Sequence, residues 1–193
     1  MKMNETNDAA LVEKQVSSEL IFDGVVVHLF RDRIELPDGK PSAREVIRHV
    51  GAVAVVPLTD DDEVVCVRQF RYPMGKVLLE IPAGKLDGKG EDHAEAALRE
   101  LREETGAQCE QLIDLGPLYP TPAYTDEVID LYLAKGLTFG NTAPDEDEFL
   151  DVVRVPLAEL VDMILRGEIA DSKTQAAILK VWVMKCRAEG KPC

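Results

Sequence analysis

The sequence has no apolar run long enough to span a bilayer and no pair of cysteines at the spacing of a metal or redox motif. Its longest apolar stretch, Val50–Leu58, is interrupted by Gly51 and Pro57 and is far shorter than the roughly 20 residues of a membrane-spanning helix. The first ten residues are polar, which argues against export. Cysteines outside any CxxC pair are typical of reduced thiols in the cytoplasm, and we expect Cys66 to be a core residue.

Positive charge is also scarce. The chain of 193 residues carries 22 Lys and Arg against 36 Asp and Glu, a formal net charge of −14. Such a balance argues against nonspecific binding to nucleic acid or to an anionic membrane. It does not exclude an anionic substrate, because metal ions and a few arginines can mediate the contact with phosphates. A hydrophobic content of 46% is enough for one substantial core.

The chain is rich in segments typical of β-strands, with one helix in the middle and two at the end. The pattern predicts an α+β fold. We expect residues 1–18 to be a tail or short helix, 19–49 a small antiparallel β subdomain, and 50–193 the main domain. The expected strands lie within 20–36 and at 43–49, 50–58, 63–70, 77–82, 111–118, 127–134 and 149–155, and the late helices at 157–166 and 172–188.

The middle helix carries three carboxylates close together. At about 100° per residue, Glu100, Glu103 and Glu104 fall within an arc of about 100°. Like charges at this spacing destabilise a helix, and acidic groups in its last turn oppose the helix dipole. A hard divalent cation with oxygen ligands would cancel the repulsion. The spacing also predicts an N-cap at Asp92 and a left-handed C-cap at Gly106.

This segment resembles the Nudix box. Every fixed position from Glu91 to Gly106 matches, including the Arg-Glu pair at Arg99 and Glu100, but six residues rather than five separate Gly84 from Glu91. The extra residue lies in a glycine-rich turn, which should tolerate an insertion. The resemblance implies an α/β/α sandwich with a mixed central sheet, preceded by the antiparallel subdomain.

The resemblance also implies the site. It assigns Glu100, Glu103, Glu104 and the backbone carbonyl of Ala83 to Mg²⁺, with Mn²⁺ as an alternative and two or three ions in all. We expect Arg99 to orient the carboxylates through ion pairs. Glu91 falls on the other side of the helix by the same angular count. It is expected to anchor the loop or cap the helix, with metal contact as the alternative, and His93 to be a surface residue.

Segments flanking the box resemble the ADP-ribose pyrophosphatase branch of the family. They are 67–73, with Arg71, 79–84 before the box, and 119–127 after it, with Pro122 sixteen residues beyond Gly106. The resemblance implies hydrolysis of ADP-ribose to AMP and ribose 5-phosphate. We expect Arg71 to hold a phosphate and stabilise charge in the transition state, with an ordinary surface cation as the alternative, and Pro122 to lie at the substrate. Arg44 and Glu45 are expected at the adenine, with an ordinary cross-strand pair as the alternative.

The acidic segment 145–148 is expected to complete the site with a carboxylate that binds metal or takes the proton from water. Glu146 and Glu148 are both candidates for this carboxylate. Alternatives remain for the substrate, namely GDP-mannose or another nucleoside diphosphate sugar, oxidised nucleotides and dinucleoside polyphosphates. A non-catalytic nucleotide-binding module is the alternative of another class. The resemblance further implies a cytoplasmic homodimer in which the N-terminal strands of one subunit help to shape the other's site.

Overall fold

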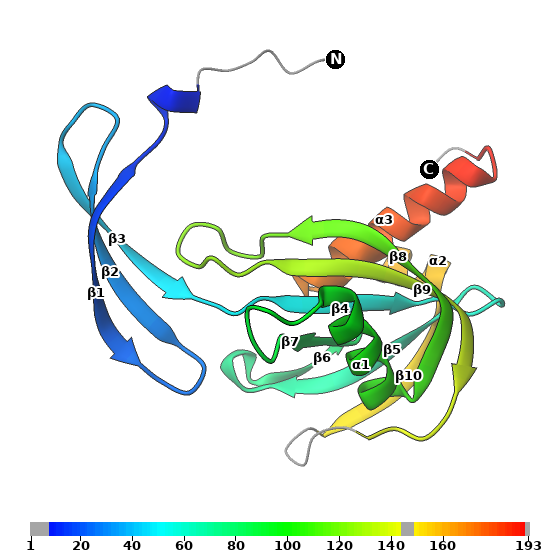
Figure 1. Ribbon diagram of the computed structural model, residues 1–193. Coiled ribbons are helices and arrows are strands. Elements are labelled where there is room, and N and C mark those ends of the chain that lie inside the picture. The colour runs from blue at the N-terminus through cyan, green and yellow to red at the C-terminus, as the bar shows by residue number, and fades with distance from the viewer. Residues whose placement is uncertain (1–7, 144–148, 192–193) are drawn as a thin grey trace. The chain divides into compact units, whose positions relative to one another are not determined.

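The computed structural model describes residues 8–143 and 149–191, which form two units (Figure 1). The smaller unit takes residues 8–49 and 121–127, and the larger takes 50–120 together with 128–143 and 149–191. The sequence divided the chain near residue 49 but did not anticipate that 121–127 returns to the smaller unit. A backbone hydrogen bond holds the returning segment to strand β3 (Pro41–Arg48), since the N–H of Ile47 donates to the carbonyl of Tyr124 at 2.8 Å.

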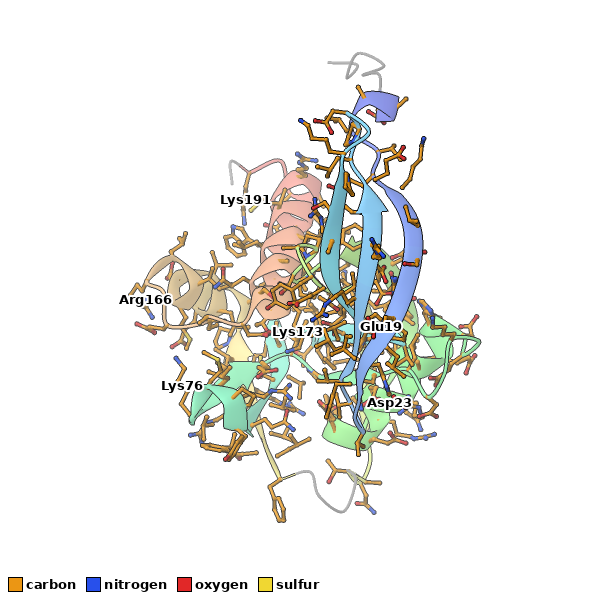
Figure 2. All side chains as sticks on the ribbon, turned by 90° about the vertical axis from the view of Figure 1, so that its left-hand side faces the viewer. Glu19, Asp23, Lys76, Arg166, Lys173 and Lys191 are labelled. Atoms are coloured by element: carbon orange, nitrogen blue, oxygen red, sulfur yellow. The ribbon has the colours of Figure 1, made fainter. Side chains whose placement is uncertain are left out.

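The smaller unit is a three-stranded antiparallel sheet in the order β1-β2-β3. Figure 2 shows this sheet with Glu19 and Asp23 labelled on its first strand. That strand begins inside the segment predicted to be a tail or short helix. The ladder extends to Lys14 because this residue pairs in register with Glu35 and forms an ion pair with it at 3.5 Å. The strands are β1 (Lys14–Asp23), β2 (His28–Glu35) and β3 (Pro41–Arg48), after a 3-10 turn at Asp8–Ala10.

A buried carboxylate ties the three strands of this sheet together. Asp32, on β2, is 5% exposed. Its oxygens accept hydrogen bonds from Gln15 at 2.8 Å and Ser18 at 2.5 Å on β1, and from Arg48 at 2.9 Å on β3. Because each strand contributes a donor, the small sheet has a polar cross-link where a domain of this size has little apolar core.

The larger unit contains two further sheets and three α-helices. Its main sheet, in the order β7-β4-β9-β8, is mixed, because β4 and β9 run parallel whereas the other neighbours run antiparallel. A second antiparallel sheet has the order β10-β5-β6. The strands are β4 (Ala52–Pro57), β5 (Glu63–Arg71), β6 (Lys76–Glu80), β7 (Ala83–Lys85), β8 (Ala107–Leu118), β9 (Ile129–Phe139) and β10 (Leu150–Pro156), and the helices are α1 (His93–Thr105), α2 (Leu157–Leu165) and α3 (Ser172–Ala188).

Strand β4 is buried on both faces, which explains its uninterrupted apolar sequence. Val53 and Val55 pack in one cluster with Leu101 of α1. Ala54 and Val56 point the other way and pack in a cluster that includes residues of α2 and α3, such as Val181. Helices therefore cover both faces of the mixed sheet, and the predicted α+β fold with an α/β/α sandwich is confirmed (Figure 1).

The core also contains Cys66, which is fully buried in β5 as expected. Burial raises the pKa of its thiol to about 12. Within the described residues, no helix is both long and apolar enough to cross a membrane.

Candidate active site

The caps predicted for the middle helix are both present and fix the position of α1. The Asp92 carboxylate accepts hydrogen bonds from the backbone N–H groups of Ala94 at 2.9 Å and Glu95 at 3.1 Å. Gly106 ends the helix with φ 69° in the left-handed region, and its N–H donates to the carbonyl of Arg102 at 2.9 Å. A helix held at both ends presents its acidic face at a defined place beside the sheet.

Arg99 lies among the acidic side chains, as the sequence predicted. Its Nη1 donates to Glu100 at 2.7 Å and to Glu103 at 3.2 Å. Partial burial lowers the pKa of the Arg99 guanidinium, but the charge and hydrogen bond of Glu100 and the hydrogen bond to Glu91 outweigh that effect, so the net pKa is raised. The guanidinium thus compensates the repulsion that makes this face costly.

Glu91 anchors the loop that precedes the helix. One of its oxygens accepts the backbone N–H of Asp87 at 2.6 Å, and the other accepts Nη2 of Arg99 at 3.2 Å. The backbone hydrogen bond, followed by that of Arg99, lowers the pKa of Glu91. Of the two roles expected for Glu91, these contacts support the loop anchor. They also keep the inserted turn closed through the bond to Asp87.

The Glu100 carboxylate approaches the backbone at Gly84 closely. A Cβ atom on Gly84 would lie 2.0 Å from Oε1 of Glu100, so no larger residue fits unless Glu100 moves. Gly84 and Ala83 are held in β7 by pairing with Val53 and Ala54 of β4. A polar hollow of about 360 Å³ opens at this place, lined by Gly84, Lys85, Leu86, Asp87, Arg99, Glu100 and Glu103.

The residues around this hollow suit a hard divalent cation. Glu100 and Glu103 offer carboxylate oxygens, and the missing Cβ of Gly84 leaves room beside Glu100. Ala83, whose carbonyl is also predicted to bind metal, precedes Gly84 in β7 but does not line the hollow. Oxygen-only ligands of this kind are typical of Mg²⁺. Within residues 8–143 and 149–191, no three acidic, His or Cys side chains converge as they stand into a cluster that could hold an ion. Glu100 and Glu103 bind Arg99 instead.

Glu104 does not line this hollow, and its charge acts on a second charged cluster. It is 3% exposed. The hydrogen bond of Glu80 raises the pKa of Arg71 most, and the charges of Glu80, Asp171 and Glu104 add to that effect. Arg71, at the end of β5, donates from Nε and Nη2 to the two oxygens of Glu80 at 2.8 and 2.7 Å. Lys173 at the start of α3 is bonded to the same carboxylate. Sequence reasoning did not identify Glu80 or Lys173 as site residues, because their contact joins segments far apart in the chain.

Three residues predicted to bind substrate belong to the smaller unit. Arg44 pairs with Glu13, and Glu45 lies opposite Arg31 with their charged atoms 3.9 Å apart. The cross-strand pair offered as the alternative for Glu45 is therefore present. Pro122 lies in the returning segment 121–127. The remaining predicted residues, Glu146 and Glu148, lie outside the described residues.

His93 was expected to be a surface residue, and its side chain is 43% exposed. It is nevertheless paired, since Nδ1 contacts the Asp130 carboxylate on β9. This contact ties the first residue of α1 to the mixed sheet. This pair could not be predicted from sequence, because Asp130 follows 37 residues later on another element.

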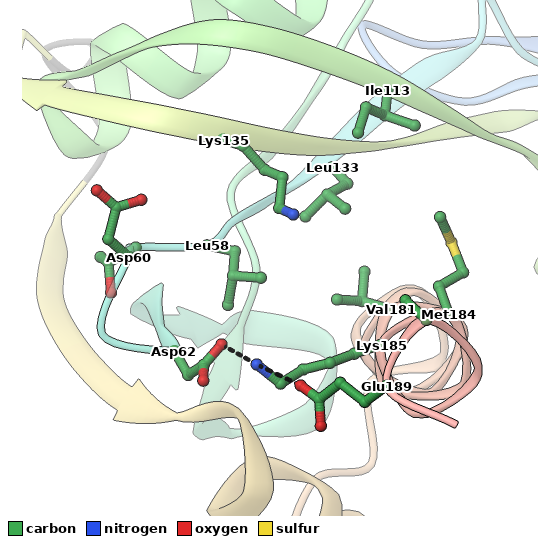
Figure 3. Close-up of a pocket in the computed structure, with 12 residues that line it drawn as sticks. Leu58, Asp60, Asp62, Ile113, Leu133, Lys135, Val181, Met184, Lys185 and Glu189 are labelled. Atoms are coloured by element: carbon green, nitrogen blue, oxygen red, sulfur yellow. Dashed lines mark hydrogen bonds and ion pairs between the residues drawn. The ribbon is translucent and has the colours of Figure 1, made fainter. Parts of the chain in front are cut away.

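Another hollow, of about 410 Å³, lies between the β4–β5 turn, β9 and the end of α3 (Figure 3). Its floor is apolar and includes Leu133 and Val181, while Lys185 at its edge bonds to Asp62 and pairs with Glu189 at 3.4 Å. Of the site residues predicted within the described chain, none lines this hollow. The hollow beside the carboxylates of α1 is therefore the better candidate for the active site.

The sequence pattern of the NUDIX domain matches residues 48–177, which include α1, the loop before it and the Arg71 cluster. The chain belongs to the Nudix family. This Nudix chain is 48% identical to the methanol dehydrogenase activator of Bacillus methanolicus over 86% of its own length and 90% of that protein. It is 42% identical to an ADP-ribose pyrophosphatase of Bacillus subtilis over 88% of its own length and 92% of that protein.

A solved structure described as an ADP compounds hydrolase has the same fold. It superposes with a TM-score of 0.82 at 25% identity and covers 94% of this Nudix chain and 98% of its own. The family and fold expected from the acidic helix are thereby confirmed.

Proposed function

We propose that this protein hydrolyses the pyrophosphate bond of ADP-ribose, or of a related nucleoside diphosphate sugar, and releases AMP and ribose 5-phosphate. The observation that carries the proposal is the acidic face of α1, on which Arg99 holds Glu100 and Glu103 beside the backbone of Gly84. Relatives named ADP-ribose pyrophosphatase, at 42% and 39% identity over most of the chain, support the choice of substrate.

The metal-binding groups in this proposal are Glu100, Glu103, Glu104 and the carbonyl of Ala83. Two or three Mg²⁺ ions, with Mn²⁺ as a substitute, supply neutralisation of the phosphate charge and activation of water when they are bound. Arg99 keeps the carboxylates oriented in the absence of the ions, as its bonds to Glu100 and Glu103 indicate.

The phosphate group is held by Arg71 in this proposal. Nε and Nη2 of Arg71 are used by Glu80, and Nη1 makes no hydrogen bond to another described residue. Planar guanidinium donors suit phosphate oxygens and stabilise charge that develops on them. Glu146 or Glu148 takes the proton from the attacking water, and Arg44, Glu45 and Pro122 contact the nucleoside.

A homodimer accompanies this function in our proposal. All residues of β1 are exposed, and large apolar side chains of the smaller unit are exposed as well, among them Leu20, Phe22 and Val25 at 48%, 57% and 98%. Apolar surface of this kind typically marks an interface. We also propose that the protein acts in the cytoplasm, in keeping with a sequence that has no CxxC pair of cysteines. Molar mass measured by light scattering tests the dimer.

A second candidate function is activation of a dehydrogenase. It is favoured by the 48% identity to the methanol dehydrogenase activator, which exceeds that to the pyrophosphatases. Hydrolysis of GDP-mannose is the alternative within the proposed chemistry, and a GDP-mannose pyrophosphatase of Yersinia enterocolitica is 31% identical. A non-catalytic binding module has no need of the carboxylates that α1 retains.

The deciding experiment measures Mg²⁺-dependent hydrolysis of ADP-ribose, GDP-mannose, NADH, diadenosine polyphosphates and 8-oxo-dGTP, with products identified by chromatography. The proposal predicts the highest kcat/KM for ADP-ribose, with AMP as a product. A preference for GDP-mannose would overturn the substrate but keep the reaction. Tight nucleotide binding without hydrolysis would favour the binding module. Stimulation of a methanol dehydrogenase with no such hydrolysis would favour the second candidate.

A further inference from the structure

One buried carboxylate binds two cations from separate elements. Glu80, at the end of β6, is 1% exposed. It accepts two parallel hydrogen bonds from Arg71 at 2.8 and 2.7 Å, and Oε2 also binds Nζ of Lys173. Lys173 lies in the first turn of α3 and is itself 8% exposed (labelled in Figure 2). A lysine buried to this extent is rare unless it is paired with an acidic group. The bond to Glu80 therefore accounts for the buried position of Lys173.

The start of α3 is fastened to the same segment by a second contact. Asp171 caps the helix by accepting the N–H of Thr174 at 2.9 Å, and it pairs with Lys173 at 3.1 Å. The hydroxyl of Thr174 donates to Asp171 at 2.6 Å and accepts the backbone N–H of Ile81 at 3.0 Å. Lys173 and Thr174 thus hold Glu80 and Ile81, two consecutive residues just ahead of the Ala83–Gly84 backbone.

The cluster contains both cations and anions. Arg71 and Lys173 carry positive charge, and Glu80, Asp171 and the nearby Glu104 carry negative charge. Burial raises the pKa of Glu80, but the hydrogen bond of Arg71 and the charge and hydrogen bond of Lys173 outweigh it, so the net pKa is lowered. Without Lys173, Arg71 would be the only cation among the described residues that bonds to the Glu80 carboxylate. The guanidinium would then form a neutral pair and attract a phosphate less strongly.

We propose that Lys173 is a positioning residue of the active site, which acts through Glu80 to hold Arg71 in place and to leave its positive charge available to the pyrophosphate. The proposal rests on the proposed function, which assigns Arg71 to the phosphate. Lys173 does not touch the substrate. It shares the Glu80 carboxylate with Arg71, so that Nε and Nη2 stay fixed, while Nη1, which bonds to no other described residue, can donate.

The first test compares Lys173→Met, which keeps the stem and removes the charge, with Lys173→Arg, which keeps the charge. Lys180→Met is the matched control, because Lys180 is an exposed residue of the same helix that donates to the carbonyl of Leu115. Calorimetry with inorganic pyrophosphate and Mg²⁺ gives Kd, and ADP-ribose hydrolysis gives KM and kcat. We expect Lys173→Met to raise Kd and KM about tenfold, the size expected for losing a hydrogen bond to a charged group.

In the same test, kcat should fall less than KM rises, because the reacting groups on α1 are unchanged. Lys173→Arg should restore Kd and KM to within about twofold of the wild-type values, since it keeps a charge-assisted bond to Glu80. Lys180→Met should leave both unchanged. If Lys173→Met does not fold, Lys173→Gln takes its place, because it removes the charge and keeps a donor.

A readout without metal or substrate is the Nε–H resonance of Arg71 in ¹⁵N NMR spectra, assigned from its loss in Arg71→Lys. We expect the hydrogen-bonded Nε–H to shift in Lys173→Met and to stay in place in Lys180→Met. A lower melting temperature with unchanged Kd, KM and Nε–H resonance would show a merely structural role and overturn the proposal. So would wild-type protein that binds no pyrophosphate.

The outcomes separate this proposal from the proposed function. If the wild-type protein cleaves ADP-ribose and Lys173→Met does so with unchanged KM, the function stands and the positioning role fails. If no nucleotide of the panel is cleaved, the proposed function fails, while pyrophosphate affinity and the Arg71 resonance still decide the role of Lys173.

Discussion

Arg99 and Glu103 are four residues apart on α1, and Nη1 of Arg99 lies 3.2 Å from Oε2 of Glu103. The same nitrogen contacts Glu100 at 2.7 Å. The guanidinium therefore occupies the side of the helix on which a metal ion is proposed to bind. It acts as an internal counter-cation for carboxylates that would otherwise repel one another.

Replacement of Arg99 should make the fold more dependent on metal. In Arg99→Met the carboxylates lose their counter-cation, so the melting temperature in EDTA should fall below that of the wild-type protein. Added Mg²⁺ should then raise the melting temperature by more than it does in the wild type. Arg102→Met, on the same helix but 3.8 Å from Glu103 and more exposed, is the control and should respond as the wild type does. Equal Mg²⁺ responses in Arg99→Met and wild type would contradict the counter-cation role.

A methyl group on Gly84 should disturb the metal site while leaving the fold intact. In Gly84→Ala the new Cβ would lie 2.0 Å from Oε1 of Glu100, and the end of that flexible side chain must turn aside. We expect the Mg²⁺ concentration for half-maximal activity to rise about tenfold, while the free energy of unfolding in EDTA changes by less than about 1 kcal/mol.

Gly88→Ala is the matched control for this substitution. It places a methyl in the loop that follows β7, where no atom lies within 4 Å of the new Cβ. Its Mg²⁺ dependence should equal that of the wild type. Equal Mg²⁺ dependence of Gly84→Ala and Gly88→Ala would remove Glu100 from the metal site.

The contribution of Glu80 to stability should depend on pH. Its pKa in the folded protein is lowered, so the stabilisation is fully present above the unfolded pKa of about 4.3 and is lost as pH falls through the folded value. Removing one partner of a buried ion pair costs about 3 kcal/mol, and Glu80→Gln should lower the free energy of unfolding by about this amount at pH 7. Urea unfolding at pH 7 and below pH 4 measures both values. A difference that stays constant down to the acid range would contradict the lowered pKa.

Loss of the N-cap of α1 should weaken the helix that carries the carboxylates. Asp92→Ala removes the acceptor for the N–H groups of Ala94 and Glu95 and should cost about 1 kcal/mol in urea unfolding. Asp92→Ser keeps a capping oxygen and should recover most of the loss. If the two variants are equally unstable, the cap contributes nothing beyond the charge of Asp92.

Local features of the site could be predicted from sequence. Asp92, Gly106 and the acidic face of α1 are determined by neighbours within one helix, where a fixed spacing sets the geometry. The mixed sheet was predicted from the family resemblance and not from periodicity. A strand buried on both faces, such as β4, lacks the alternation of apolar and polar residues that identifies a strand in a sequence. The three residues of β7 were missed because so short a strand has no pattern of its own.

Contacts between distant segments could not be predicted in this way. Lys173 and Glu80 are separated by 93 residues, and nothing in the sequence around Lys173 distinguishes it from Lys180 and Lys185 of the same helix. The start of β1 was missed for a similar reason, since its residues are exposed and their order is decided by pairing with β2. The predicted roles of Arg44, Glu45, Pro122, Glu146 and Glu148 remain predictions.

The most direct test of the account is the rate of AMP release from ADP-ribose as Mg²⁺ is titrated, in the wild-type protein and in Glu103→Gln. The account predicts saturable activation by Mg²⁺ in the wild type and a loss of at least about a hundredfold in kcat/KM in Glu103→Gln, because an amide is a weaker ligand than a carboxylate. Circular dichroism should show that both proteins are folded. Equal rates in the two proteins, or AMP release without Mg²⁺, would contradict the assignment of the acidic face of α1 as the metal-dependent active site.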